Sequence, residues 1–196
     1  HGHGNANLLC RLSENNRMGA IIEQKPVKLI TSIILKDESA LASAEEELKK
    51  LYGALEPLDK FIPFDYTDYY WEEMGRPLKR KLICFKELRD REDIARIKVE
   101  TNEIEKRTSV DNKRTVNIDP GYVTEAKLVL LTTKDYTHRV HIGKRIFAES
   151  TLYWQDGGFR PWPWTYPDYA SDELVSYFNG TREIYMQNIK NGSHDT

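Results

Sequence analysis

The sequence predicts a single α+β domain with a mainly antiparallel sheet and helices packed against it. Apolar, β-branched runs alternate along the chain with segments whose apolar residues recur every three to four positions. In the first half these segments follow the order β-α-β-β-α-β, which is the order of a ferredoxin-like fold. A chain of 196 residues, 39% of them hydrophobic, suits one domain of ordinary size and is too hydrophobic for intrinsic disorder.

The first predicted unit is a strand followed by a helix. Residues 27–35 (VKLITSIIL) form a nearly continuous apolar run, which is typical of a buried strand. Asp37 is placed to cap a helix over residues 38–52, and Gly53 is placed to end it. The hydrophobic face of this helix consists of Leu41, Ala44, Leu48 and Leu51.

Three further strands and a second helix complete the first half. Residues 58–66 and 78–88 are expected to be strands. Asp90 is placed to cap a helix whose inward positions are Ile94, Ile97, Thr101 and Ile104. Residues 115–118 follow as a short strand, which the turn Asp119-Pro120-Gly121 is expected to end.

The second half of the sequence continues with an ambiguous segment and a hairpin. Residues 124–133 (TEAKLVLLTT) suit a helix that Thr124 caps and that carries Lys127 and Lys134 on one face. Residues 127–132 equally suit a buried strand, and we favour the helix. Residues 138–153 are expected to form a hairpin with Gly143-Lys144 as a two-residue type II′ turn. In that register His138 faces Glu149.

A proline- and aromatic-rich loop over residues 155–170 precedes the last helix, which Ser171 caps and which runs to about residue 190. Residues 1–17 form a polar leader and residues 191–196 a polar tail, and both are expected to be flexible. The single domain therefore covers residues 18–190, with Met18 as the natural start.

Charge and cysteine content exclude several classes of protein. The 29 Lys and Arg against 31 Asp and Glu give a net charge of −2, which offers no electrostatic case for a nucleic-acid partner or an anionic membrane. No apolar run approaches the roughly 20 residues of a membrane span. Two cysteines, Cys10 and Cys84, make no disulfide framework, so we expect a cytoplasmic protein.

The common catalytic motifs are absent from the sequence. It has no GxxxxGK[ST] phosphate loop, no GxGxxG dinucleotide fingerprint and no GxSxG nucleophile elbow. Its cysteines and histidines do not cluster at zinc spacing. A site must therefore be sought in less familiar groups of residues, of which four stand out.

The first group lies in residues 61–73 (FIPFDYTDYYWEE), where acidic residues alternate with aromatic ones. Asp65 and Asp68 form a pair of carboxylates suited to a divalent cation or to general-base chemistry, and Tyr69 is placed to stack on a ligand ring. The alternative is that both aspartates make local turns while the rings belong to the core.

The second group centres on Asp119, at the end of a predicted strand, where open α/β sheets often bind ligands. The alternative is a plain turn with aspartate at its first position.

The third group is basic. A convergence of Lys and Arg suits recognition of phosphate or carboxylate, and His138 opposite Glu149 suits an oriented acid or base. The alternative is a set of solvated hairpin charges with one cross-strand ion pair. The candidate ligand-binding residues of this group are Lys79, Arg80, Lys127, Lys134 and Arg139.

The fourth group is the loop over residues 161–169 (PWPWTYPDY), where four aromatic residues alternate with prolines. Trp164 and Tyr166 are candidates for stacking on a base or ring. The loop equally suits covering a sheet edge or presenting a surface to a partner.

Several of these segments together resemble the bacterial and archaeal family catalogued as domain of unknown function 4416. The matching segments include PFDYTDYYWEEMG, VNIDPGYVTEAKLVLLTTKDYTHRVHIG and PWTYPDY, and the resemblance runs from about residue 19 to residue 185. The resemblance implies no reaction, because no activity is assigned to the family, and no catalytic residues can be transferred from it.

The residues lead to two hypotheses about function, and they leave open whether the protein is an enzyme. The first is a site for a phosphorylated or nucleotide-like anion, with Mg²⁺-assisted hydrolysis as its catalytic form. In it Asp65, Asp68, Asp119 and His138 are the catalytic candidates, and the basic residues above bind the ligand together with Tyr69, Trp164 and Tyr166. The second is a non-catalytic interaction module that uses the Trp/Pro/Tyr-rich loop to contact a protein, including a second copy of this chain.

Overall fold

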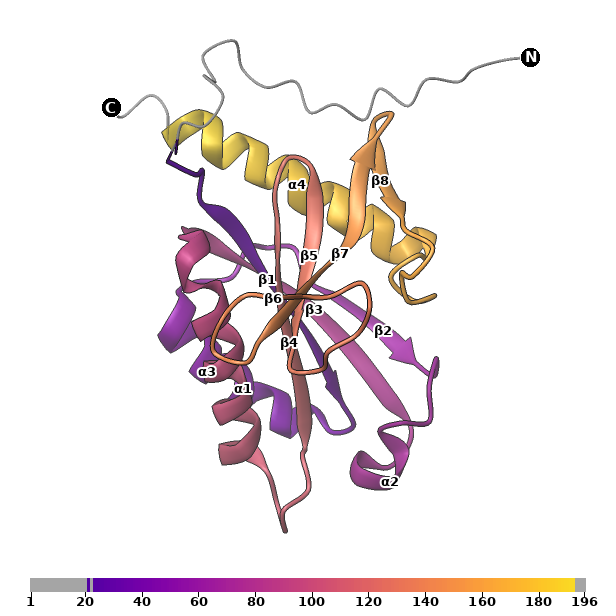
Figure 1. The fold of residues 1–196 in the computed structure, drawn as a ribbon. Coiled ribbons are helices and arrows are strands. Elements are labelled where there is room, and N and C mark those ends of the chain that lie inside the picture. Colours follow the sequence, from indigo (N-terminus) through magenta and orange to yellow (C-terminus); the bar gives the residue numbers. More distant parts are fainter. Residues whose placement is uncertain (1–20, 22, 193–196) are drawn as a thin grey trace, which may run out of the picture.

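One antiparallel sheet of eight strands runs through the molecule in the computed structural model, which describes residue 21 and residues 23–192 (Figure 1). Neighbouring strands follow the order β2-β3-β1-β4-β5-β7-β6, and β8 pairs with β7. The strands are β1 (Val27–Leu35), β2 (Lys60–Phe64), β3 (Leu78–Arg89), β4 (Val116–Val123), β5 (Lys127–Thr132), β6 (Val140–His141), β7 (Phe147–Gln155) and β8 (Gly158–Pro161).

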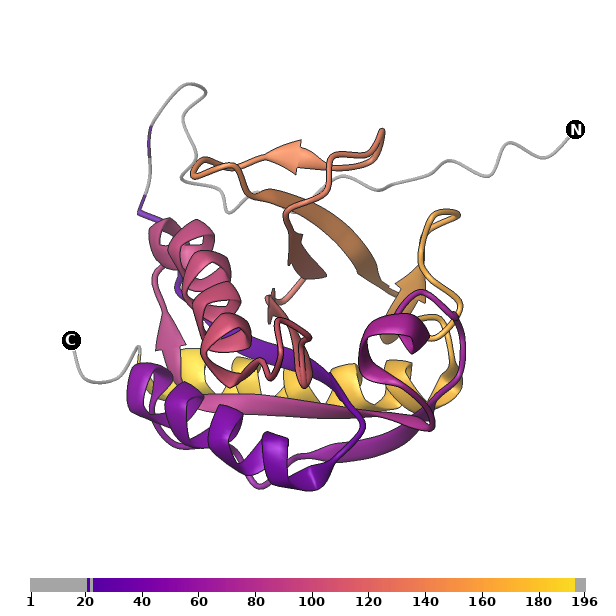
Figure 2. The same cartoon turned by 90° about the horizontal axis from the view of Figure 1, so that it is seen from below.

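Helices cover both faces of this sheet. The α-helices are α1 (Glu38–Tyr52), α2 (Trp71–Met74), α3 (Ile94–Thr108) and α4 (Asp172–Gly192), and a 3-10 turn over Arg91–Asp93 leads into α3. α1 and α3 pack side by side on one face, while α4 lies across the other (Figure 2). In β1, Leu29 and Ile33 point toward α1 and α3, whereas Ile30 points toward α4. The central strand is therefore buried at every position, as its continuous apolar run predicts.

The prediction of an α+β domain with a mainly antiparallel sheet and a C-terminal helix is confirmed. β1 and α1 have the predicted bounds, and Gly53 ends α1 with a φ of 81°. Asp37 occupies the predicted cap position, although its side chain makes no capping hydrogen bond. Ser171 does cap α4, because its Oγ accepts the N–H of Leu174 at 3.3 Å.

Both ends of the chain lie partly outside the residues that the structure describes. The predicted leader over residues 1–17, including Cys10, and the last four residues lie outside the described residues. Helix α4 extends through Gly192, so the first two residues of the predicted tail belong to the helix. In the described part of the chain no helix is long and apolar enough to span a membrane.

The predicted helix over residues 124–133 is wrong, because this segment contains strand β5. Leu128 and Leu130 belong to the core cluster beneath α4, whereas Val129 and Leu131 belong to the cluster beneath α1 and α3. A short strand buried on both faces has no alternating pattern, and its apolar run resembles that of a buried helix.

The predicted turn Asp119-Pro120-Gly121 is also wrong, because β4 continues through these residues to Val123. All three pair with β1, opposite Ser32, Thr31 and Ile30. Local turn preferences give way here to pairing with the most buried strand of the sheet.

The hairpin exists, but its register differs from the prediction by one residue. Val140 pairs with Ala148, and the residues with positive φ at the turn are Gly143, Lys144 and Arg145. The N–H of Ile146 donates to the carbonyl of Gly143 at 2.8 Å, which places Lys144 and Arg145 at the centre of the turn.

The predicted loop over residues 155–170 contains the short strand β8. Asp156 and Gly157 connect β7 to β8 with φ values of 48° and 79°, the signature of a tight hairpin turn. The Asp-Gly pair was a signal for this turn in the sequence that the prediction missed.

Candidate functional site

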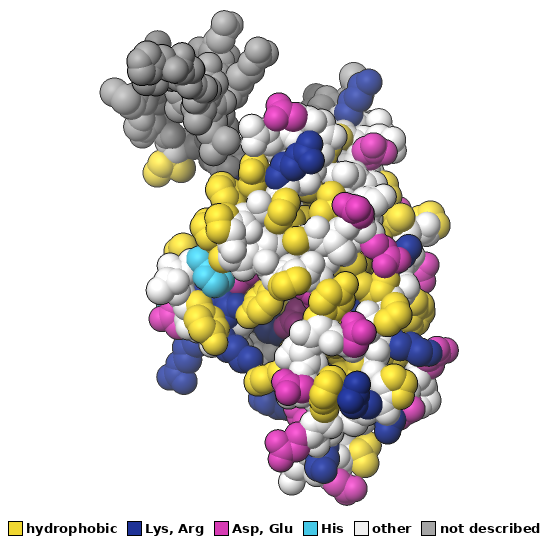
Figure 3. Space-filling view, turned by 90° about the vertical axis from the view of Figure 1, so that its right-hand side faces the viewer, with side chains coloured by type: hydrophobic (Ala, Val, Ile, Leu, Met, Phe, Trp, Pro, Cys, Tyr) yellow, Lys and Arg dark blue, Asp and Glu magenta, His cyan; other side chains and the backbone are white. Residues whose placement is uncertain are grey.

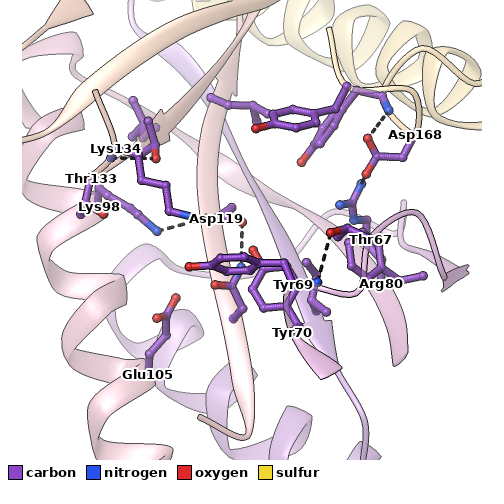
Figure 4. Close-up of a pocket in the computed structure, with 18 of the residues that line it drawn as sticks. Thr67, Tyr69, Tyr70, Arg80, Lys98, Glu105, Asp119, Thr133, Lys134 and Asp168 are labelled. Carbon is purple, nitrogen blue, oxygen red and sulfur yellow. Dashed lines mark hydrogen bonds and ion pairs between the residues drawn. The ribbon is translucent and has the colours of Figure 1, made fainter. Parts of the chain in front are cut away.

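The sheet forks between β4 and β5, and the fork opens a cavity. Residues 121–123 of β4 pair with residues 128–130 of β5. Among the described strands, β4 pairs only with β1 before residue 121, and β5 pairs only with β7 after residue 130. A cavity of about 780 Å³ lies at this fork, and its lining includes Asn117 and Asp119 of β4 and Leu130 and Leu131 of β5. Figure 4 shows the cavity with Asp119 on its wall. Its size suits a small-molecule ligand.

The close approach that precedes the fork depends on Gly121. A Cβ atom built on Gly121 would lie 2.5 Å from the carbonyl oxygen of Val129 and 2.9 Å from Cδ2 of Leu130. Any side chain here would push the two strands apart. Pro120, which comes just before it, has no N–H to donate to a ladder.

Several separate parts of the chain form the walls of the cavity. α3 forms one side, the segment between β2 and α2 forms another, and the aromatic loop before α4 and the segment after β5 complete it. The polar and aromatic side chains of the lining include Tyr69, Tyr70, Arg80, Lys98, Asn102, Glu105, Arg114, Asn117, Asp119, Lys134, Tyr136, Arg139, Glu149, Tyr166 and Asp168.

A polar network centred on Asp119 crosses the cavity wall. Oδ1 of Asp119 accepts Nζ of Lys98 at 3.2 Å, and Oδ2 accepts Nδ2 of Asn117 at 2.8 Å. Lys98 also donates to the carbonyl of Ile118 at 2.8 Å, and its side chain is 5% exposed. The Asp119 side chain is 34% exposed, so this carboxylate is held from two sides while remaining accessible.

The network continues to Arg114 and Glu105. Arg114 donates to Oδ1 of Asn117 at 2.7 Å and forms a bidentate pair with Glu73. Glu105 accepts the backbone N–H of Ile118 at 2.6 Å, beside the edge of β4. Burial raises the pKa of Glu105, although Lys98 and this hydrogen bond act in the opposite direction.

A second buried pair holds the aromatic loop onto the sheet. Nη1 of Arg80 lies 2.6 Å from Oδ2 of Asp168, and both side chains are buried. The guanidinium lies between the rings of Phe64 and Tyr169, at 4.7 and 4.8 Å from their centroids. Arg80 therefore fixes the segment before α4 as one wall of the cavity.

The exposed rim of the cavity is basic and aromatic. Nζ of Lys134 lies 4.1 Å from the centroid of Tyr69, and Lys134 forms no ion pair with a carboxylate of the described residues. Arg139 donates to Glu149 at 2.7 Å and to the carbonyl of Lys134 at 3.1 Å. Tyr69, Tyr136 and Tyr166 are each more than half exposed at this rim.

His138 lies beside the cavity within a stack of aromatic rings. Its ring is stacked between Tyr136 and Trp164, and Nε2 lies 3.2 Å from Oε2 of Glu149. The predicted proximity of His138 and Glu149 therefore occurs, although the strand register that suggested it does not. Trp164 continues the stack to Trp162, with 5.1 Å between their ring centroids.

Six of the candidate residues from the sequence line this one cavity and six do not. Asp65, Asp68, Lys79, Lys127, His138 and Trp164 are not among its lining residues. Asp65 and Asp68 are exposed, and the carbonyl of Asp68 accepts the N–H of Trp71 in a local turn. Lys79 forms an exposed ion pair with Glu38, and Lys127 lies at the end of β5 away from the cavity.

The other six candidate residues are brought together in the lining of the cavity. They are Tyr69, Arg80, Asp119, Lys134, Arg139 and Tyr166.

Lys98 and Glu105 carry much of the network, and neither was predicted from the sequence. Both lie on the inward side of α3, four residues after Ile94 and Thr101 respectively. Charged residues at such spacing interrupt the hydrophobic face of the helix. This interruption is the signal in the sequence that could have identified Lys98 and Glu105 as buried polar residues.

No ready-made metal centre is present in the part of the chain that the structure describes. There, no three His, Cys, Asp or Glu side chains are grouped so as to hold a metal ion. Asp119 alone among the predicted catalytic carboxylates lines the cavity.

Comparison with known proteins identifies the family. The family model described as a domain of unknown function, DUF4416, matches residues 25–185, so the chain belongs to this family. No curated protein and no solved structure matches the chain. The matched segment contains all the residues of the forked sheet and its cavity.

Proposed function

We propose that this member of the family binds an anionic small molecule, phosphorylated or nucleotide-like, in the cavity at the fork of the sheet. The observation that carries the proposal is the charge of the cavity lining. Six basic side chains stand against four acidic ones: Arg80, Lys98, Lys106, Arg114, Lys134 and Arg139 against Glu105, Asp119, Glu149 and Asp168.

The pairing of these charges supports Lys134 as the contact for the proposed anion. Arg80, Lys98 and Arg139 are each paired with a carboxylate of the lining. The ammonium of Lys134 lies over the ring of Tyr69 and pairs with no carboxylate among the described residues. An anion at Lys134 would gain a charged partner without displacing a carboxylate. The exposed faces of Tyr69 and Tyr166 are available to a planar group of the same ligand.

Binding is better supported than hydrolysis. The ligand-site hypothesis expected Asp65 or Asp68 to line one pocket with Asp119 and at least two of the candidate basic residues. Asp119 and three of those basic residues line the cavity, whereas neither Asp65 nor Asp68 does. The second carboxylate on which hydrolysis depended is therefore missing from it. Of the carboxylates predicted to hold Mg²⁺, Asp119 alone could contact an ion in this cavity, together with the phosphate of the ligand. Mg²⁺ accepts one or two carboxylates with substrate phosphates in phosphoryl-transfer sites.

A thermal-shift titration tests the proposal. The probes are inorganic phosphate, pyrophosphate and ribonucleotides, each with and without Mg²⁺. A probe that binds only the native state raises the midpoint of unfolding with its concentration. We expect Lys134→Gln to abolish most of the shift and Lys127→Gln, which removes the same charge at the far end of β5, to preserve it. Equal shifts in both variants, or none in the wild type, would contradict the proposal, and release of inorganic phosphate would reveal catalysis.

The interaction module remains the alternative, supported by the exposure of two rings. Trp164 is 40% and Tyr166 is 53% exposed. Against it, the indole N–H groups of Trp162 and Trp164 both donate to Ser150, so neither indole N–H is left for a partner protein. Figure 3 shows that the side of the molecule carrying β2 and β8 has hydrophobic side chains interrupted by charged ones. Concentration-dependent sedimentation of the wild type and of Trp164→Ser would test self-association.

We also propose that the first half of the chain has a ferredoxin-like arrangement. The neighbour order β2-β3-β1-β4, with α1 and α3 on one face, supports such a first half, to which β5–β8 and α4 are added.

A further inference from the structure

The buried part of the cavity offers a different chemistry from its rim. The side chains of Lys98, Arg80 and Glu105 line the cavity but are less than 10% exposed, and each already faces an opposite charge. A phosphate placed against this wall would lie beside the carboxylates of Asp119 and Glu105, which repel it. The buried wall is therefore suited to an uncharged polar group.

Asp119 and Lys98 leave one matched set of hydrogen-bonding positions unused. The ammonium of Lys98 has three N–H donors, of which Ile118 and Asp119 occupy two. A carboxylate offers about four lone-pair positions, and Lys98 and Asn117 occupy two of those on Asp119. With respect to the residues that the structure describes, one donor of Lys98 and two acceptor positions of Asp119 therefore remain without a partner, on atoms about 3 Å apart.

Hydroxyl groups match this arrangement better than the other common ligand groups. A hydroxyl both donates and accepts, so two adjacent hydroxyls can donate to Asp119 while one accepts from Lys98. A phosphate can only accept and would face Asp119, and an ammonium can only donate and would face Lys98.

From this we infer that the cavity takes a phosphorylated compound with vicinal hydroxyls, such as a sugar phosphate or ribonucleotide. The hydroxyls bind Asp119 and Lys98, and the phosphate lies at Lys134. This inference rests on the anion-binding function proposed above, and it gives Asp119 a binding role in place of a catalytic one.

Two probes of the same length separate the hydroxyl contribution from the phosphate contribution. Glycerol 3-phosphate carries two vicinal hydroxyls, and propyl phosphate carries none. Because hydrogen bonds to charged groups strengthen binding, we expect glycerol 3-phosphate to bind the wild-type protein about tenfold tighter than propyl phosphate. Ligand-observed NMR titration measures the two affinities. Ribose 5-phosphate is expected to bind at least as tightly as glycerol 3-phosphate.

Variants assign the difference to particular residues. In Asp119→Asn, we expect the preference for glycerol 3-phosphate to shrink to about threefold or less while propyl phosphate binds no more weakly than before. In Lys134→Gln, both probes should weaken by the same factor. Circular dichroism melts establish that each variant is folded before it is titrated.

The failures are distinguishable from one another. Equal affinity of the wild type for both probes overturns the hydroxyl site and leaves the anion site standing. A preference that survives Asp119→Asn also overturns the assignment to Asp119. Absence of binding by every phosphorylated probe overturns this inference and the proposed function together.

Discussion

Lys98 of α3 and Asp119 of β4 are joined by an ion pair of 3.2 Å across the edge that β5 leaves exposed at the fork. The pair links the helix layer to the strand that forms the cavity wall. Because the Lys98 side chain is 5% exposed, its charge depends on this carboxylate and on the carbonyl of Ile118 for compensation.

Removal of the carboxylate from this pair should destabilise the protein. We expect Asp119→Ala to lower the free energy of unfolding by about 2–3 kcal/mol, because it leaves a buried ammonium with one partner fewer. Asp119→Asn keeps an acceptor for Lys98 and should cost about 1 kcal/mol. Urea denaturation of the two variants measures the difference, and equal losses would show that the charge pair contributes little.

The pair between Arg114 and Glu73 makes stability depend on pH in acid. The hydrogen bonds from Arg114 hold the pKa of Glu73 below the ordinary glutamate value of 4.5. A lowered carboxyl pKa stabilises the native state above the unfolded value, and the stabilisation is lost as pH falls through the folded value.

Glu73→Gln should therefore cost about 1 kcal/mol at neutral pH, and the difference from the wild type should vanish as pH falls below 4.5. Glu72→Gln is the matched control, because Glu72 directly precedes Glu73, is exposed and forms no ion pair with another described residue. Chemical denaturation across an acid series checks both variants. A gap that persists in acid would mean that Glu73 acts through packing rather than charge.

The sequence predicts well those elements whose ends are marked by capping or turn residues and whose apolar residues form either one helix face or an unbroken run. β1 has an uninterrupted apolar run, and α1 lies between Asp37 and Gly53. The site depends on contacts that no local pattern contains. Lys98 meets Asp119 only because α3 packs beside β4, and Asp119-Pro120-Gly121 extends a strand only because β1 lies alongside to pair with it.

Cys84 should behave as an inert thiol in the native protein. It is 0% exposed, and burial raises its pKa to about 12, so neither access nor thiolate is available at neutral pH. In a Cys10→Ser background we expect no alkylation of Cys84 by iodoacetamide until denaturant is added, with stoichiometric reaction thereafter, measured by mass spectrometry. Rapid alkylation under native conditions would indicate that the sheet opens locally around β3.

The fork itself can be tested at Gly121, where β4 and β5 approach most closely. A Cβ atom at this position would lie 2.5 Å from the backbone oxygen of Val129, and a backbone atom cannot yield as the end of a side chain does. Gly121→Ala should therefore cost at least about 2 kcal/mol of unfolding free energy and disturb the cavity.

Gly180 provides the matched control for this substitution. It lies inside α4, where an added Cβ would meet its nearest neighbour, Cδ2 of Leu58, at 3.8 Å, an ordinary contact. Gly180→Ala should stabilise the protein by about 0.5–1 kcal/mol, because alanine favours a helix interior over glycine. Thermal and urea unfolding of the two variants should therefore move in opposite directions. If Gly121→Ala is as stable as the wild type, β4 and β5 are not held together at Gly121, and the fork that opens the cavity does not begin there.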